Sequence, residues 1–130
     1  MIIITKKPIG ITKGKFHPCP NSPNCVSSQS TDEEHKMSPL SYNTSLEDAK
    51  TRIFKIINSL KRSKIITETK DYIHIEFRTA VFRFVDDVEF FFNDSKKIVE
   101  FRSAARLGYS DLGVNKKRME NITKLFLSEN

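Results

Sequence analysis

The two cysteines, Cys19 and Cys25, are the first residues of this chain that could do chemistry, and five residues separate them. A disulfide between them would close a small loop and stabilise the fold by roughly 2 kcal/mol. Free thiolates could instead ligate a metal ion or act as nucleophiles. The spacing leaves these alternatives open, and a stiff loop with two structural cysteines is the simplest of them.

Two histidines flank this pair, and with free thiols they could form a metal site or a catalytic pair. His17, Cys19, Cys25 and His35 include the ligand types of a Cys2His2 zinc site, but their spacing matches no familiar zinc module. We therefore expect no metal and keep these four residues as the alternative metal site. His35 could also serve as the base that activates Cys25, because thiol catalysis needs a neighbouring base.

A second group of charged residues brackets two expected strands. Asp86 and Asp87 precede one strand, and Arg102 and Arg106 end the next. In an antiparallel hairpin that turns near residues 93–96, these acidic and basic side chains lie close enough to pair. Neighbouring strand residues point to opposite faces, so Asp86 and Asp87 are not expected to converge as a catalytic pair or cation site. The pattern favours a structural network of ion pairs.

The start of the last expected helix breaks a local rule. Lys116, Lys117 and Arg118 occupy its first turns, where the positive end of the helix dipole disfavours cations. Asp111 could compensate as a cap or counter-ion, or an external anion could bind the helix N–H groups. The anion site that we expect here comprises Arg102, Arg106, Asp111, Asn115, Lys117 and Arg118.

Two helices and four strands are expected to position these residues. Ser45, with Asp48 three residues later, predicts the start of a helix over 46–62. An apolar stripe at helical spacing predicts a second helix over 114–128. Residues 1–44 hold all five prolines and are expected to form a long irregular arm.

Strands are expected between the two helices, where apolar and polar residues alternate or β-branched residues gather. The fold class is therefore α+β, with a four-stranded, mostly antiparallel sheet flanked by two helices. We expect a single domain over residues 1–130, with an α-β-β-β-β-α core over 45–130. The expected strands cover residues 64–69, 72–79, 87–93 and 97–103.

Composition narrows the classes of partner. The chain has 130 residues, is 38% hydrophobic and 29% charged, and carries a net charge of +6. This basic charge is spread out, and its longest run, 116–118, is too short for the stripe of a nucleic-acid binder. The apolar run at 1–4 is too short to span a membrane, and it precedes its lysines, unlike a signal peptide. We therefore expect no nucleic-acid partner, no transmembrane segment and a cytoplasmic location, or an envelope location if a leader was removed.

Two stretches of the chain resemble a known family. One is Cys19-Pro-Asn-Ser-Pro-Asn-Cys25-Val-Ser-Ser28, and the other runs from Phe84 to Asn115 and includes Arg102-Ser-Ala-Ala-Arg106. Together they resemble the domain of unknown function 1499 family of bacteria and plants, over about residues 17–127. The resemblance implies no settled activity. Members of this family often carry N-terminal membrane or targeting segments.

The chain has none of the sequence motifs that mark serine hydrolases, zinc proteases, phosphate-binding loops or dinucleotide-binding folds. We therefore expect a non-catalytic module without a cofactor. It would bind an anionic small molecule or an acidic protein segment near the start of the C-terminal helix. The alternative is an enzyme that uses Cys25 or the carboxylates of Asp86 and Asp87, with His35 as its base. No oligomeric state follows from these features.

Overall fold

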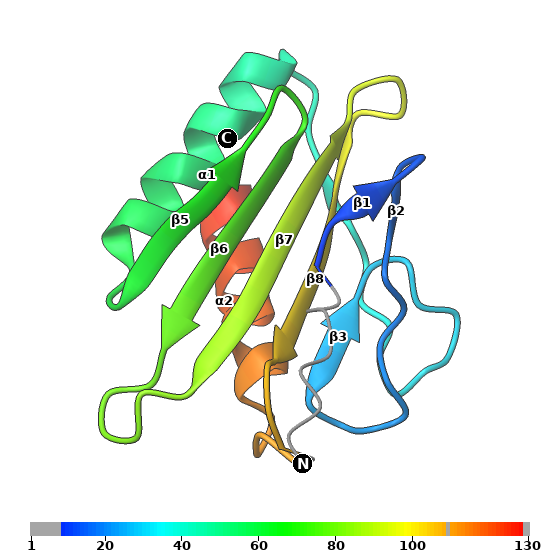
Figure 1. The fold of residues 1–130 in the computed structure, drawn as a ribbon. Helices are drawn as coiled ribbons and strands as arrows, with labels where there is room; N and C mark the ends of the chain where they lie inside the picture. The colour runs from blue at the N-terminus through cyan, green and yellow to red at the C-terminus, as the bar shows by residue number, and fades with distance from the viewer. Residues whose placement is uncertain (1–8, 109, 129–130) are drawn as a thin grey trace.

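The computed structural model describes residues 9–108 and 110–128 of the chain. An antiparallel sheet with the strand order β3-β8-β7-β6-β5 forms its centre, and β4 also pairs with β8. Two helices lie behind the sheet in Figure 1 and leave its other face toward the viewer. The long elements are α1 (Leu46–Ser59), β5 (Ser63–Glu68), β6 (Tyr72–Arg78), β7 (Val85–Asn93), β8 (Ile98–Ala105) and α2 (Val114–Ser128).

Four short strands come from the arm that precedes α1. Strands β3 and β4 both pair with β8 and widen the sheet, whereas β1 and β2 form a separate hairpin. The expected sheet of four strands is therefore wrong, although the α+β class, the two helices and the antiparallel pairing are confirmed. Two or three residues are too few to show a strand's alternation, which is why the sequence did not predict these elements. They are β1 (Ile11–Thr12), β2 (Lys15–Phe16), β3 (Cys25–Ser27) and β4 (Leu40–Ser41).

Helix α1 begins as its sequence predicts and ends slightly earlier. The Ser45 side chain caps it by accepting a hydrogen bond from the backbone N–H of Asp48 at 3.0 Å. The helix ends at Ser59 because Leu60 takes an extended backbone and Arg62 a left-handed one, with φ of 62°. This turn reverses the chain so that β5 follows at once.

The hydrophobic core lies between the helices and one face of the sheet. Alternate residues of β6, β7 and β8 point to this face, as the period of two requires. Each fully buried phenylalanine there stabilises the fold by about 1.5–3 kcal/mol relative to an exposed one. The core includes Ile53, Ile57, Ile73, Ile75, Phe77, Val88, Phe90, Phe92, Val99, Phe101, Met119, Ile122 and Phe126.

The opposite face of the same three strands carries polar side chains, and the arm lies over part of it. Gly10 donates its backbone N–H to Glu89 on β7 at 2.9 Å. Gly14, in the β1–β2 turn, approaches the ring of Phe91, which lies 3.4 Å from where a Cβ would stand. Among the described helices, none is long and apolar enough to cross a membrane.

Candidate functional site

The sheet face opposite the helices holds a set of charged and polar side chains that we call the polar-face cluster. They come from alternate positions of β6, β7 and β8 and, for Arg106, from the residue after β8. Register places them side by side: Glu89, for example, lies opposite His74 on one side and Arg102 on the other. All are buried except Arg106, which is partly exposed. The members are Tyr72, His74, Glu76, Asp87, Glu89, Arg102 and Arg106.

Asp87 is the centre of one half of this cluster. Arg106 binds both of its oxygens, at 3.0 and 2.7 Å, and the Nε2 atom of His74 lies 2.8 Å from Oδ1. Arg106 also donates to Glu76 at 2.7 Å. Burial alone would raise the pKa of Asp87, but the hydrogen bonds from His74 and Arg106 outweigh it and lower the pKa to about 2. Asp87 is therefore ionised at neutral pH, and its charge holds both partners in place.

Glu89 and Arg102 form the other half and are almost completely buried, at 0% and 1% exposed. Tyr72 donates its hydroxyl to Glu89 Oε2 at 2.6 Å, and burial with this hydrogen bond raises the pKa of Tyr72. The Nη1 atom of Arg102 is 3.8 Å from Glu89 Oε1, which is an ion pair but too long for a hydrogen bond. Within the described part of the chain, neither Glu89 Oε1 nor Arg102 Nε has a hydrogen-bond partner.

Asp86 points the other way, toward α2, as the alternation of strand residues predicts. Arg118 donates to its Oδ2 atom at 2.7 Å and lies over the ring of Phe77, 4.7 Å from its centroid. Arg118 also donates to Asn115, which accepts a 2.6 Å hydrogen bond from Ser103. Asp86 and Asp87 are thus on opposite faces of the sheet, each with its own arginine.

The start of α2 is capped from within the chain. The Asp111 carboxylate accepts hydrogen bonds from the backbone N–H groups of Gly113 and Asn115 at 2.9 and 3.0 Å. Although burial opposes it, these bonds and one from the Asn115 side chain lower the pKa of Asp111. Lys116 and Lys117 point to solvent. Of the two roles considered for Asp111, the cap is the one that the geometry supports.

The six residues expected to form one anion site do not form a single cluster. Asp111, Asn115 and Arg118 lie together on the helix side of the sheet. Arg102 and Arg106 lie on the opposite face, where acidic residues already pair with them. Lys117 is exposed and separate from both groups. Arg106 and Asp111 nevertheless line the same cavity, which is described below.

Cys19 and Cys25 form a disulfide, with their Cα atoms 5.7 Å apart. Because both sulfurs are bonded to each other, neither is available to bind a metal or to act as a nucleophile together with His17 or His35. Disulfides persist mainly in oxidising compartments, so this bond favours such a compartment over the cytoplasm expected from the sequence.

His35 holds the disulfide loop in place. Its Nδ1 atom lies 2.5 Å from Asp32 Oδ2, and its Nε2 atom lies 2.7 Å from the backbone oxygen of Ser22. Two acceptors call for two N–H donors, which only the protonated imidazolium supplies. Burial lowers the pKa of His35, but these contacts outweigh it and raise the pKa above its ordinary value. Glu34 and Asp32 offer oxygens within 4.8 Å of the ring, yet both ring nitrogens already have partners.

A cavity of about 450 Å³ opens beside the start of α2, between the β6–β7 connection and the β8–α2 loop. Apolar groups dominate its wall, and Arg83 and Arg106 supply cationic groups. Asp86 and Asp111 also line it, but the first is paired with Arg118 and the second caps α2. Sequence reasoning missed this cavity, whose one signal was the run Val81-Phe82-Arg83-Phe84 between two strands. The lining residues used below are Arg83, Phe84, Arg106, Leu107 and Val114.

Comparison with curated proteins found no match for this chain. The family resemblance drawn from the two motifs, in contrast, is confirmed. A family model described as "Protein of unknown function (DUF1499)" matches residues 15–126, which is most of the chain and includes the disulfide loop, the polar-face cluster and the cavity. The chain therefore belongs to the DUF1499 family.

Proposed function

We propose that the protein is a non-catalytic binding module whose ligand is a small anionic molecule with an apolar body. The site is the cavity beside the start of α2. The observation that carries this proposal is a mostly apolar cavity of about 450 Å³ with a cation at its wall. Small-molecule sites usually have this size and combine an apolar lining with a few polar groups that fix orientation.

Arg83 is the residue that would bind the anion. Within the described part of the chain no carboxylate pairs with Arg83, whereas Arg106 already bonds to Asp87 and Glu76. The positive charge of Arg106 is therefore neutralised, and that of Arg83 is available. Phe84, Leu107 and Val114 would pack against the apolar body of the ligand.

The catalytic alternative has less support. It requires a free Cys25 thiol with His35 as base, or the two carboxylates of Asp86 and Asp87 acting together. Cys25 is bonded to Cys19, and both His35 nitrogens are engaged by other groups. The two carboxylates are on opposite faces of the sheet. An acidic protein segment remains a second ligand class for the same cavity, since Arg83 would attract either.

Calorimetric titration with octanoate, octyl phosphate and uncharged octanol tests this proposal. We expect both anions to bind and octanol to bind more weakly. Arg83→Gln should weaken octanoate binding about tenfold or more, because hydrogen bonds to charged groups contribute roughly 1.5–3 kcal/mol.

Arg62→Gln is the matched control, since Arg62 is also an exposed arginine with a left-handed backbone, at φ of 62° against 56° for Arg83. It lies outside the cavity wall and should leave affinity unchanged. Equal octanoate affinities for the two variants, or no binding by the unaltered protein, would overturn the proposal.

A further inference from the structure

Two loops at one end of the molecule expose large apolar side chains. In the β6–β7 connection, Val81 is 81% exposed and Phe82 is 75% exposed, and the rings of Phe82 and Phe84 stack with centroids 5.6 Å apart. In the β8–α2 loop, Leu107 and Leu112 are also largely exposed, Leu112 at 87%. We call these five residues the apolar tips. Exposed apolar groups gathered in one place usually mark a surface that binds a partner.

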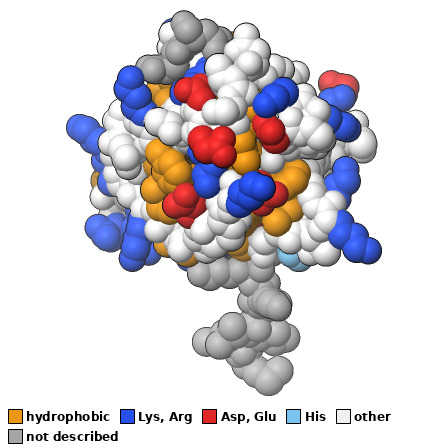
Figure 2. Space-filling view, turned by 90° about the horizontal axis from the view of Figure 1, so that it is seen from above, with side chains coloured by type: hydrophobic (Ala, Val, Ile, Leu, Met, Phe, Trp, Pro, Cys, Tyr) orange, Lys and Arg blue, Asp and Glu red, His pale blue; other side chains and the backbone are white. Residues whose placement is uncertain are grey.

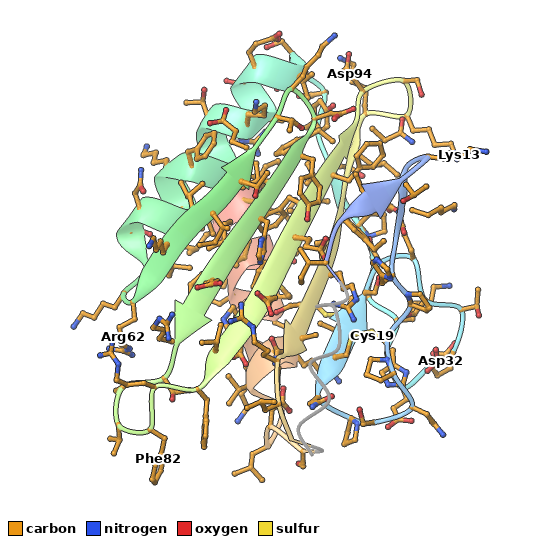
Figure 3. All side chains as sticks on the ribbon, viewed as in Figure 1. Lys13, Cys19, Asp32, Arg62, Phe82 and Asp94 are labelled. Atoms are coloured by element: carbon orange, nitrogen blue, oxygen red, sulfur yellow. A yellow bond between two sulfur atoms is a disulfide. The ribbon has the colours of Figure 1, made fainter. Side chains whose placement is uncertain are left out.

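The apolar tips lie at the end of the molecule opposite the β7–β8 turn. Figure 3 shows Phe82 at this end, with Arg62 beside it and Asp94 at the far end. Figure 1 shows that α2 also starts there. The shared cavity confirms that the two loops are neighbours, because Phe84 of one and Leu107 of the other both line it.

The exposed charges around the tips are positive. The α1–β5 turn adjoins the end of β6, since Arg62 donates its Nε–H to the backbone oxygen of Arg78 at 3.2 Å. The acidic side chains of the adjoining strand ends, by contrast, are buried and bonded to arginines. Their basic neighbours face the solvent, together with the partly exposed carboxylate of Asp111, which is engaged in capping α2. These exposed cations are Arg62, Arg78, Arg83, Lys116 and Lys117.

The opposite end of the molecule has no such asymmetry. Figure 2 views that end from above, and acidic and basic side chains lie side by side on it. Asp94 and Lys97, for example, form an exposed ion pair at 2.8 Å. Exposed cations thus surround apolar groups at the end that carries the tips, although one of them, Arg78, also pairs with Glu76 at 3.5 Å.

We propose that this end docks on an anionic lipid bilayer. The apolar tips would enter the boundary between headgroups and acyl chains, about 5–10 Å deep, and the surrounding cations would meet the anionic headgroups. A lipid surface fits better than a protein partner because Val81, Phe82 and Leu112 protrude from two turns and do not line the cavity. A planar layer that is anionic outside and apolar beneath complements tips encircled by cations.

The docking surface overlaps the proposed small-molecule site at Arg83, Phe84 and Leu107, but the two proposals can be tested apart. Val81, Phe82 and Leu112 protrude from the loops but do not line the cavity. A double variant, Phe82→Ser with Leu112→Ser, therefore removes two apolar tips and replaces no residue of the cavity wall. Its octanoate titration reports on the cavity, and its vesicle binding reports on the docking surface.

Co-sedimentation with vesicles tests the docking. We expect the protein to bind vesicles of 70% phosphatidylcholine and 30% phosphatidylserine, and to bind pure phosphatidylcholine at least tenfold more weakly. The double tip variant should lose tenfold or more, because burial of each large apolar side chain is worth about that factor. Lys116→Gln with Lys117→Gln should lose about fivefold per lysine, and added salt should weaken binding.

Two controls and two contrary outcomes complete the experiment. Leu127→Ser removes an exposed leucine from the far end of α2, and Lys96→Gln removes a lysine at the opposite end of the molecule. Both should bind vesicles as the unaltered protein does. Equal binding to charged and uncharged vesicles, or by the tip variant and the unaltered protein, would overturn the docking. So would sedimentation velocity that shows the tips joining two copies while no vesicle binds.

Discussion

Asp87 is only 4% exposed, and hydrogen bonds from both Arg106 and His74 stabilise its charge. Asp87→Asn keeps the shape of the side chain and removes that charge. We expect it to lower the free energy of unfolding by about 2–4 kcal/mol, because removing one partner of a buried pair leaves the other uncompensated. Urea denaturation at pH 7 measures this loss.

Asp94→Asn is the control for this substitution. Asp94 pairs with Lys97 at 2.8 Å, as close as the contacts of Asp87, but about half of each side chain is exposed. Exposed pairs contribute about 0–1 kcal/mol, so Asp94→Asn should change the stability little. If both variants lost the same free energy, burial would not be what makes the Asp87 contacts strong.

The elements that the sequence predicted are those with enough residues to show a period. Helix α2 occupies 114–128 as expected, and the alternation of β6 and β7 placed Asp86 and Asp87 on opposite faces. Strands β3 and β4 are too short for such a pattern. Their pairing with β8 depends on contacts between residues far apart in the sequence.

The cavity could not be predicted for a related reason. Its wall comes mainly from two loops. The direction of a side chain in a loop depends on the conformation of the turn and not on a helix or strand periodicity that can be read from the sequence. Arg83 and Leu112 both take left-handed backbone conformations, with φ of 56° and 57°. Such conformations are uncommon for residues other than glycine. Because neither position is a glycine, asparagine or aspartate, the sequence gives no signal for them.

Helix α2 offers a prediction about an element. Asp111→Ala removes an acceptor for the N–H groups of Gly113 and Asn115, which should cost about 1–2 kcal/mol. Thermal unfolding should therefore show a transition lower by several degrees. Glu120→Ala alters an exposed position of the same helix and should change the stability by at most about 0.5 kcal/mol. Equal losses of stability in the two variants would mean that Asp111 acts only through its negative charge and not as a hydrogen-bonding cap.

At the scale of the whole molecule, the arm before α1 is tied to the sheet by contacts from several directions. Gly10 bonds to Glu89, and the Pro18 oxygen accepts a 3.4 Å hydrogen bond from Arg102. The disulfide and His35 close the loop that follows. The prolines led us to expect a long irregular arm, but nothing local in the sequence indicated that this arm would cover part of the polar-face cluster.

These titratable contacts predict a pH window for the stability of the whole molecule. Asp87 has a lowered pKa, so its contribution is complete above about pH 4 and disappears as the pH falls through about 2. That contribution is about 2 kcal/mol at neutral pH. His35 has a raised pKa, so its contribution is complete below about pH 6.5 and disappears as the pH rises through the folded-state value. Stability should therefore be greatest between about pH 4 and 6.5.

Denaturation of variants across pH 2–9 separates the two limbs of this window. Asp87→Asn should flatten the acid limb and leave the alkaline one, because the amide does not titrate. His35→Gln should flatten the alkaline limb, because glutamine has no proton to lose as the pH rises. His17→Gln, at an exposed histidine of the same arm, should retain both limbs. An alkaline limb that persisted in His35→Gln would show that a different group governs how firmly the disulfide loop is held.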